Sequence, residues 1–129
     1  MLYTEGGVYS DIDNVPLVPL EQFIDPEADL VTCSSYWDEM KFNFNPNFIY
    51  TKQNCSIMKK CMDWYLQKFK SNSPYKYWQW SVMRAFSDIL RLDNYHKKQG
   101  VYKITNGSLK IQILEERKGK NHLDAHNVF

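Results

Sequence analysis

Apolar residues recur at helical spacing in the middle of the chain. Between residues 56 and 69 they fall three or four positions apart, and lysine, aspartate and glutamine occupy the positions opposite. This pattern predicts an amphipathic helix over 56–69, with Asn54 or Ser56 as its N-cap and the polar cluster 71–74 as its end. A second apolar stripe predicts another helix over 77–90.

Alternating apolar and polar residues mark a hairpin late in the chain. Leu109, Ile111 and Ile113 alternate with polar side chains, as one buried face of a sheet requires. Another apolar stretch precedes them, and Asn106-Gly107 between the two is a strong signal for a tight β-turn. We therefore expect an antiparallel hairpin over 101–114 whose three apolar side chains face inward.

Shorter signals predict the remaining elements. They indicate the tail of a helix before Gly6-Gly7, extended chain from residue 8, a turn or short helix over 17–24, strands over 30–33 and 48–50, and a loop over 42–47. Interleaved short strands and helices are typical of an α/β layer structure, and 129 residues is the length of a single domain.

Composition narrows the classes of partner. Sixteen basic and fifteen acidic residues give a net charge of +1, so no overall field favours nucleic acid, and we expect no such partner. No apolar run approaches the ~20 residues of a membrane-spanning helix, so no membrane span is expected. Cys33, Cys55 and Cys61 form no Cys-x-x-Cys pair, and reduced thiols fit a reducing compartment such as the cytoplasm.

Asp11 and Asp13 are the candidates for metal chemistry. Residues two apart in an extended chain point to the same side, so the two carboxylates would face one point and repel each other. A hard divalent cation, Mn²⁺ or Mg²⁺, would relieve this repulsion and complete its shell with water and substrate phosphates. Gly6 and Gly7 remove side chains where a ligand or another backbone comes close.

Spacing alone leaves other interpretations of Asp11 and Asp13 open. The pair also fits a solvated turn or the first half of a calcium loop, although the downstream Gly and Glu of such a loop are missing.

Residues 2–20 carry a longer pattern, LY..GG.Y.D.D..PL.PL. The residues that make it up are Leu2, Tyr3, Gly6, Gly7, Tyr9, Asp11, Asp13, Pro16, Leu17, Pro19 and Leu20. This pattern resembles the Asp-x-Asp region of the sugar-binding glycosyltransferases, which include glycosyltransferase family 32 and the related glucosylating toxins. The resemblance implies a GT-A fold, in which a mixed sheet is flanked by helices, and a metal-dependent, retaining transfer of a hexose from a nucleotide sugar such as a UDP- or GDP-hexose.

The resemblance also implies roles for particular residues. Asp11 would contact the donor sugar and ribose, and Asp13 would ligate the metal beside it. The cation, Mn²⁺ or Mg²⁺, would neutralise the charge that develops on the departing nucleoside diphosphate. The remaining donor contacts would come from Gly6, Gly7 and Tyr9, and a further metal contact would come from His126 or, less directly, His122.

This chain departs from the family pattern at two places. Family members place a nucleotide-binding β/α/β region before the Asp-x-Asp segment, whereas five residues precede Gly6 here. We therefore expect 1–129 to form a partial GT-A domain that transfers sugar poorly by itself. The segment 77–81 also stands where many members carry a Gly-Pro element, so the resemblance fixes neither the sugar nor the acceptor, which would be a glycan or a protein.

The alternative is a catalytically inactive remnant that binds nucleotide sugars or acts as an interaction module. A longer protein with an N-terminal anchor would be in the Golgi lumen rather than the cytoplasm. Trp78 and Trp80 fit either stacking on a ligand or helix packing, and the spacing of Asp88 and Asp93 does not single them out as acceptor contacts.

Overall fold

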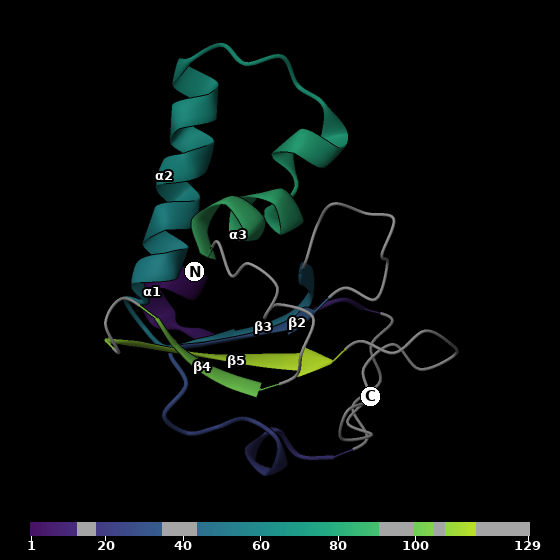
Figure 1. The fold of residues 1–129 in the computed structure, drawn as a ribbon, viewed down its shortest axis with the longest axis vertical. Helices are drawn as coiled ribbons and strands as arrows, with labels where there is room; N and C mark the ends of the chain where they lie inside the picture. Colours follow the sequence, from purple (N-terminus) through teal and green to yellow (C-terminus); the bar gives the residue numbers. More distant parts are fainter. Residues whose placement is uncertain (13–17, 35–43, 91–99, 105–107, 116–129) are drawn as a thin grey trace.

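Five strands form one mixed sheet in the computed structural model, which describes residues 1–12, 18–34, 44–90, 100–104 and 108–115 (Figure 1). The strands are β1 (Gly7–Ser10), β2 (Leu30–Ser34), β3 (Phe44–Thr51), β4 (Gly100–Ile104) and β5 (Leu109–Glu115). Their order across the sheet is β1-β3-β2-β5-β4, and only β2 and β5 pair in parallel. The predicted α/β class, with a mixed sheet flanked by helices, is confirmed.

The helices are α1 (Leu2–Glu5), α2 (Ser56–Lys70) and α3 (Val82–Leu90), with short 3₁₀ helices η1 (Leu20–Gln22) and η2 (Tyr77–Trp80). The prediction of α2 is confirmed, but its N-cap is Cys55, without a side-chain hydrogen bond. Asn54 does not cap the helix because it lies in a left-handed turn (φ 59°), where its backbone N–H donates to Tyr3 O at 2.7 Å. None of the helices in the described ranges is long and apolar enough to cross a membrane.

The helix predicted over 77–90 is broken at Ser81. This residue is extended (ψ 153°) and separates η2 from α3. Its hydroxyl accepts a hydrogen bond of 3.2 Å from the N–H of Arg84, a contact typical of a helix N-cap. The apolar periodicity of this region hid a capping residue, so the first turn of the predicted helix is a separate 3₁₀ turn.

The predicted hairpin of β4 and β5 is confirmed. Ile104 pairs with Leu109 and Gly100 with Ile113 in antiparallel register, whereas the turn residues Asn106-Gly107 lie outside the described ranges. Leu109, Ile111 and Ile113 face the core beneath the helices, as expected.

Both faces of the sheet are covered, which the alternating pattern of β5 did not predict. Helices α2 and α3 pack on one face, and the segment 18–28 with η1 covers the other (Figure 1). Gln112 points to this second face and is only 8% exposed. Its side-chain amide donates to Phe23 O at 2.7 Å and accepts from the N–H of Asp25 at 2.8 Å. A polar residue in β5 therefore fastens the covering segment instead of facing solvent.

Strand β3 contains a bulge where the sequence predicted a loop. Val31 pairs with Tyr50, but Cys33 pairs with Asn45, so β3 has more residues than β2 across this interval. Pro46 lies inside the bulge, where its missing N–H breaks no regular ladder. The prediction of a loop over 42–47 is thus wrong for residues 44–47, because their Asn and Pro residues mark a bulge within a strand.

Candidate functional site

A cleft of about 700 Å³ lies between the helices and the β1–β3 side of the sheet. Its volume falls in the ~300–1,000 Å³ range of small-molecule sites. Two groups of side chains line its ends. We call Tyr9, Asp11, Asn45 and Asn47 the carboxylate end, and Tyr65, Tyr75, Tyr77 and Trp80 the aromatic wall. Ile49 and Phe86 add apolar surface to the lining.

Asp11 is fixed at the end of β1. Its N–H donates to Asn47 O at 2.8 Å, which extends the β1–β3 ladder by one residue. The hydroxyl of Tyr9 donates to Asp11 Oδ1 at 2.7 Å, and within the described part of the chain Oδ2 has no hydrogen-bond partner. Among the described residues, one carboxylate oxygen of Asp11 therefore has a hydrogen-bond partner and the other has none.

The pKa of Tyr9 is raised, chiefly because its hydroxyl donates a hydrogen bond to the Asp11 carboxylate and also because that negative charge disfavours the phenolate. Tyr9 therefore stays protonated at neutral pH and serves as a donor that orients Asp11, not as a base.

The β3 bulge supplies the rest of the carboxylate end. It brings Asn45 and Asn47 to the cleft, and the N–H of Asn47 donates to Asn45 Oδ1 at 3.3 Å. Bulges commonly redirect side chains beside functional sites. Sequence reasoning missed both residues, although the Asn-Pro-Asn run was the signal that could have indicated a bulge.

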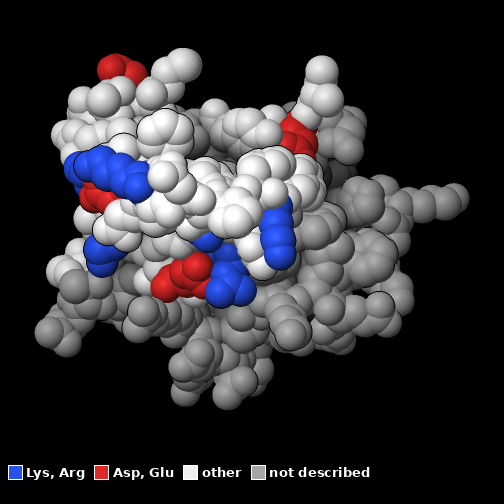
Figure 2. All heavy atoms as spheres, turned by 90° about the horizontal axis from the view of Figure 1, so that it is seen from above, with Lys and Arg blue, Asp and Glu red and all other residues white. Residues whose placement is uncertain are grey.

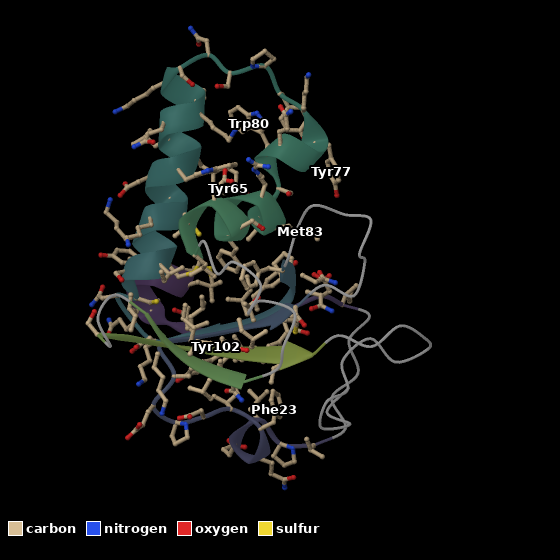
Figure 3. All side chains as sticks on the ribbon, in the orientation of Figure 1. Phe23, Tyr65, Tyr77, Trp80, Met83 and Tyr102 are labelled. Atoms are coloured by element: carbon tan, nitrogen blue, oxygen red, sulfur yellow. The ribbon has the colours of Figure 1, made fainter. Side chains whose placement is uncertain are left out.

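Hydrogen bonds hold the aromatic wall in place. The hydroxyl of Tyr65 donates to Trp80 O at 2.9 Å, and Trp80 Nε1 donates to Pro74 O at 3.1 Å. The rings of Tyr75 and Trp80 are tilted with centroids 6.0 Å apart. Tyr65 and Trp80 lie between α2 and η2, whereas Tyr77 lies on the side of η2 away from α2 (Figure 3). Of the two predicted tryptophans, Trp80 lines the cleft; the side chain of Trp78 lies outside what the structure describes.

The charge of the cleft is concentrated in one residue. Among the described residues that line it, Asp11 alone carries a formal charge at neutral pH. Cys61 also lines the cleft, but burial raises the pKa of its thiol to about 12, so it is not a thiolate nucleophile. The described lining residues therefore offer oxygen atoms at the carboxylate end and aromatic rings at the aromatic wall.

Gly6 and Gly7 of the motif allow backbone conformations that other residues adopt only with strain. Gly6 has φ 70°, and a Cβ there would lie 2.7 Å from the backbone nitrogen of Gln53. Gly7 has φ 112°, a conformation that strains other residues. At Gly6 the backbone that comes close, as expected, is that of the residues at the end of β3. Neither glycine is among the described residues that line the cleft.

Several predicted site residues cannot be placed. Asp13, Asp93, His122 and His126 lie outside the described residues. In the ranges that are described, no group of three or more His, Cys, Asp or Glu side chains could hold a metal ion. Asp88 has a structural role, since it accepts from Trp64 Nε1 at 3.1 Å and pairs with Arg84 at 2.8 Å.

Function must be inferred from the cleft and from the pattern of residues 2–20. Comparisons of the chain with protein-family models, with curated protein sequences and with solved structures found no match.

Proposed function

We propose that this chain is the metal- and donor-binding part of a glycosyltransferase that moves a hexose from a nucleotide sugar to an acceptor. One observation carries the proposal. The carboxylate of Asp11, the first acid of the Asp-x-Asp pattern, lies at a cleft of about 700 Å³ that is lined by amides and aromatic rings. A carboxylate in this setting suits a sugar nucleotide, which has hydroxyls, a diphosphate and a flat base.

The donor atoms at the carboxylate end fit Mn²⁺ or Mg²⁺. Asp11 offers one carboxylate oxygen beyond the one that Tyr9 holds, and Asn45 and Asn47 line the same end of the cleft. Hard divalent cations prefer such oxygen ligands and complete their shells with water and phosphate. Asp13, two residues further on, would supply the second carboxylate.

The shortage of positive charge also supports a cation. None of the described side chains lining the cleft is Lys or Arg, so a diphosphate would find no compensating charge there. A bound divalent ion would supply that charge and stabilise the leaving diphosphate. Tyr9 and Asp11 would orient the donor, and in keeping with the resemblance we assign a retaining outcome to the transfer.

A calorimetric titration tests the proposal. We expect Mn²⁺ together with a UDP- or GDP-hexose to bind the protein, with weaker binding when EDTA replaces Mn²⁺. Asp11→Asn and Asp13→Asn should each reduce the affinity, and Asp13→Asn should affect the metal more. Asp63→Asn is a matched control, because Asp63 pairs with Lys59 on α2 and does not line the cleft.

Two results are decisive. Unchanged affinity in both Asp11→Asn and Asp13→Asn would exclude the assignment of the metal and donor site. Binding without release of nucleotide or transfer of sugar, across a panel of acceptors, would favour the inactive nucleotide-sugar-binding module over the enzyme.

A further inference from the structure

The aromatic wall exposes more ring surface than a packed helix junction requires. Tyr75 and Tyr77 are 71% and 66% exposed while they line the cleft. Viewed from the end where α2 and η2 are joined, much of the described surface is uncharged, with Lys and Arg side chains set apart from one another (Figure 2). Grouped aromatic side chains at a concave surface are typical of ligand sites.

The wall is fixed before any ligand arrives. Tyr65 anchors the main chain of Trp80, and Pro74 O fixes the orientation of its indole. Tyr75 packs against Trp80 at the 6.0 Å ring distance given above. Rings that are already ordered lose little conformational freedom on binding, so more of the contact energy remains as affinity.

The charges around the wall select a neutral ligand. Lys68 is a basic group beside the wall, and its ammonium lies 4.5 Å from the ring centroid of Trp64 and 5.9 Å from that of Trp80. Lys68 is therefore engaged with the rings, and no Lys or Arg is among the described lining residues. Against the lining residues that the structure describes, an anionic ligand would lose its hydration without gaining a basic partner.

The polarity of the wall selects among neutral ligands. The lining combines tyrosine hydroxyls and the Ser81 hydroxyl with ring faces and the apolar side chains of Val82 and Met83. A lipid chain would leave such hydroxyls without water. A pyranose presents an apolar face of C–H groups to a ring and a rim of hydroxyls to polar neighbours, which matches this combination of groups.

We propose that the aromatic wall is a binding site for a neutral oligosaccharide, which stacks on the exposed rings of Tyr75 and Tyr77 and binds without a cation or a nucleotide. Its role as the acceptor rests on the proposed function. The carboxylate end opens into the same cleft, so a saccharide on the wall and a donor at Asp11 would share that cleft.

Binding of four neutral tetrasaccharides, mannotetraose, maltotetraose, chitotetraose and xylotetraose, tests the proposal. It is followed by saturation-transfer NMR and tryptophan fluorescence in EDTA, with UMP and a heparin tetrasaccharide as anionic probes. The variants are Tyr75→Ala, Tyr77→Ala and Tyr77→Phe. Phe69→Ala is the matched control, since Phe69 is 74% exposed on α2 but does not line the cleft.

We expect at least one neutral tetrasaccharide to bind in EDTA. Each tyrosine-to-alanine change should weaken it by about fivefold or more, while Tyr77→Phe and Phe69→Ala should stay within about twofold of the parent. Circular dichroism confirms that each variant is folded. Absence of binding by all four tetrasaccharides, equal losses in Phe69→Ala, or capture of the anionic probes alone would overturn the proposal.

The saccharide site and the donor site can fail separately. If the protein binds a saccharide, keeps that binding in Asp11→Asn and binds neither Mn²⁺ nor nucleotide sugars, the saccharide site is supported. The glycosyltransferase function is then excluded. Binding of the donor without any saccharide would do the reverse.

Discussion

The hydroxyl of Tyr9 and the carboxylate of Asp11 lie two residues apart on the same side of β1 and are joined by a hydrogen bond of 2.7 Å. This bond orients Asp11 at the cleft and raises the pKa of Tyr9. The titration of Tyr9 therefore reports on the Asp11 carboxylate, so this hydrogen bond can be measured without a ligand.

Asp11→Asn should lower the pKa of Tyr9 towards its ordinary value of ~10, because the amide removes the negative charge that opposes the phenolate. The difference between the ultraviolet titrations of the parent and the variant isolates this one tyrosine. Tyr9→Phe supplies the control, since the alkaline titration step that disappears in it belongs to Tyr9. Identical titrations for the parent and Asp11→Asn would contradict the hydrogen bond.

Tyr9→Phe should also weaken Mn²⁺-dependent binding of the donor. The change removes one partly exposed hydrogen bond to a carboxylate, so we expect a loss of about 1 kcal/mol, or roughly fivefold in affinity. Titration calorimetry would measure it. A loss as large as that of Asp11→Asn would mean that Tyr9 contacts the ligand directly.

Gln112→Ala should destabilise the fold. The change leaves Phe23 O and the N–H of Asp25 without their side-chain partner and opens a cavity beneath the covering segment. A buried group that loses its partner costs about 1–3 kcal/mol, and urea denaturation would measure the loss. Gln112→Glu keeps the shape but cannot donate to Phe23 O, so it should also be less stable than the parent. A neutral result for both would show that the segment 18–28 is held by its apolar contacts alone.

Stability should fall in acid through Asp25. The backbone N–H of Glu27 and the ammonium of Lys110 lower the pKa of Asp25 in the folded state, and the charge of Lys52 acts in the same direction. A depressed carboxyl pKa contributes stability that is complete above the unfolded pKa of ~3.9 and is lost as the pH falls through the folded value. The urea midpoints of the parent and Asp25→Asn should therefore converge below about pH 4. A constant difference between pH 7 and pH 3 would contradict this linkage.

The three cysteines should be unreactive in the folded protein. Cys33, Cys55 and Cys61 are buried and form no disulfide, and the Cys61 thiol has a pKa of about 12. A thiol reagent at pH 8 should label none of them at first and all three in guanidinium chloride. Prompt labelling of Cys61 in the native protein would show that the cleft opens beyond the described structure.

The sequence predicted those elements whose pattern is long and local. The amphipathic period of α2 runs over four turns, and the turn dipeptide between β4 and β5 leaves one simple pairing. Ser81 was missed because a single capping hydroxyl decides the break between η2 and α3 inside an apolar stripe. The bulge of β3 was missed because Pro46 resembles a loop residue unless its partner strands are known.

The residues of the candidate site also fall into those that a local pattern predicted and those that it did not. Asp11 was predicted because its spacing from Asp13 and the motif around it are local properties of the chain. Asn47 and Tyr75 were not, since they reach the cleft through the β3 bulge and the turn after α2. Proximity of this kind depends on tertiary packing, which no short pattern records.

The parallel pairing of β2 with β5 determines when the sheet can be completed during synthesis. Leu30 pairs with Ile111, so the buried middle of the sheet has no partner on one side until the chain has been synthesised beyond residue 115. During that interval the apolar strand β2 presents unpaired backbone groups, a known route to aggregation. Contacts between residues so distant in sequence form slowly. The hairpin of β4 and β5 therefore pairs with β2 late in folding and completes the sheet. Released chains that stop before Leu109 should therefore aggregate or depend on chaperones, and released chains that include Glu115 should not.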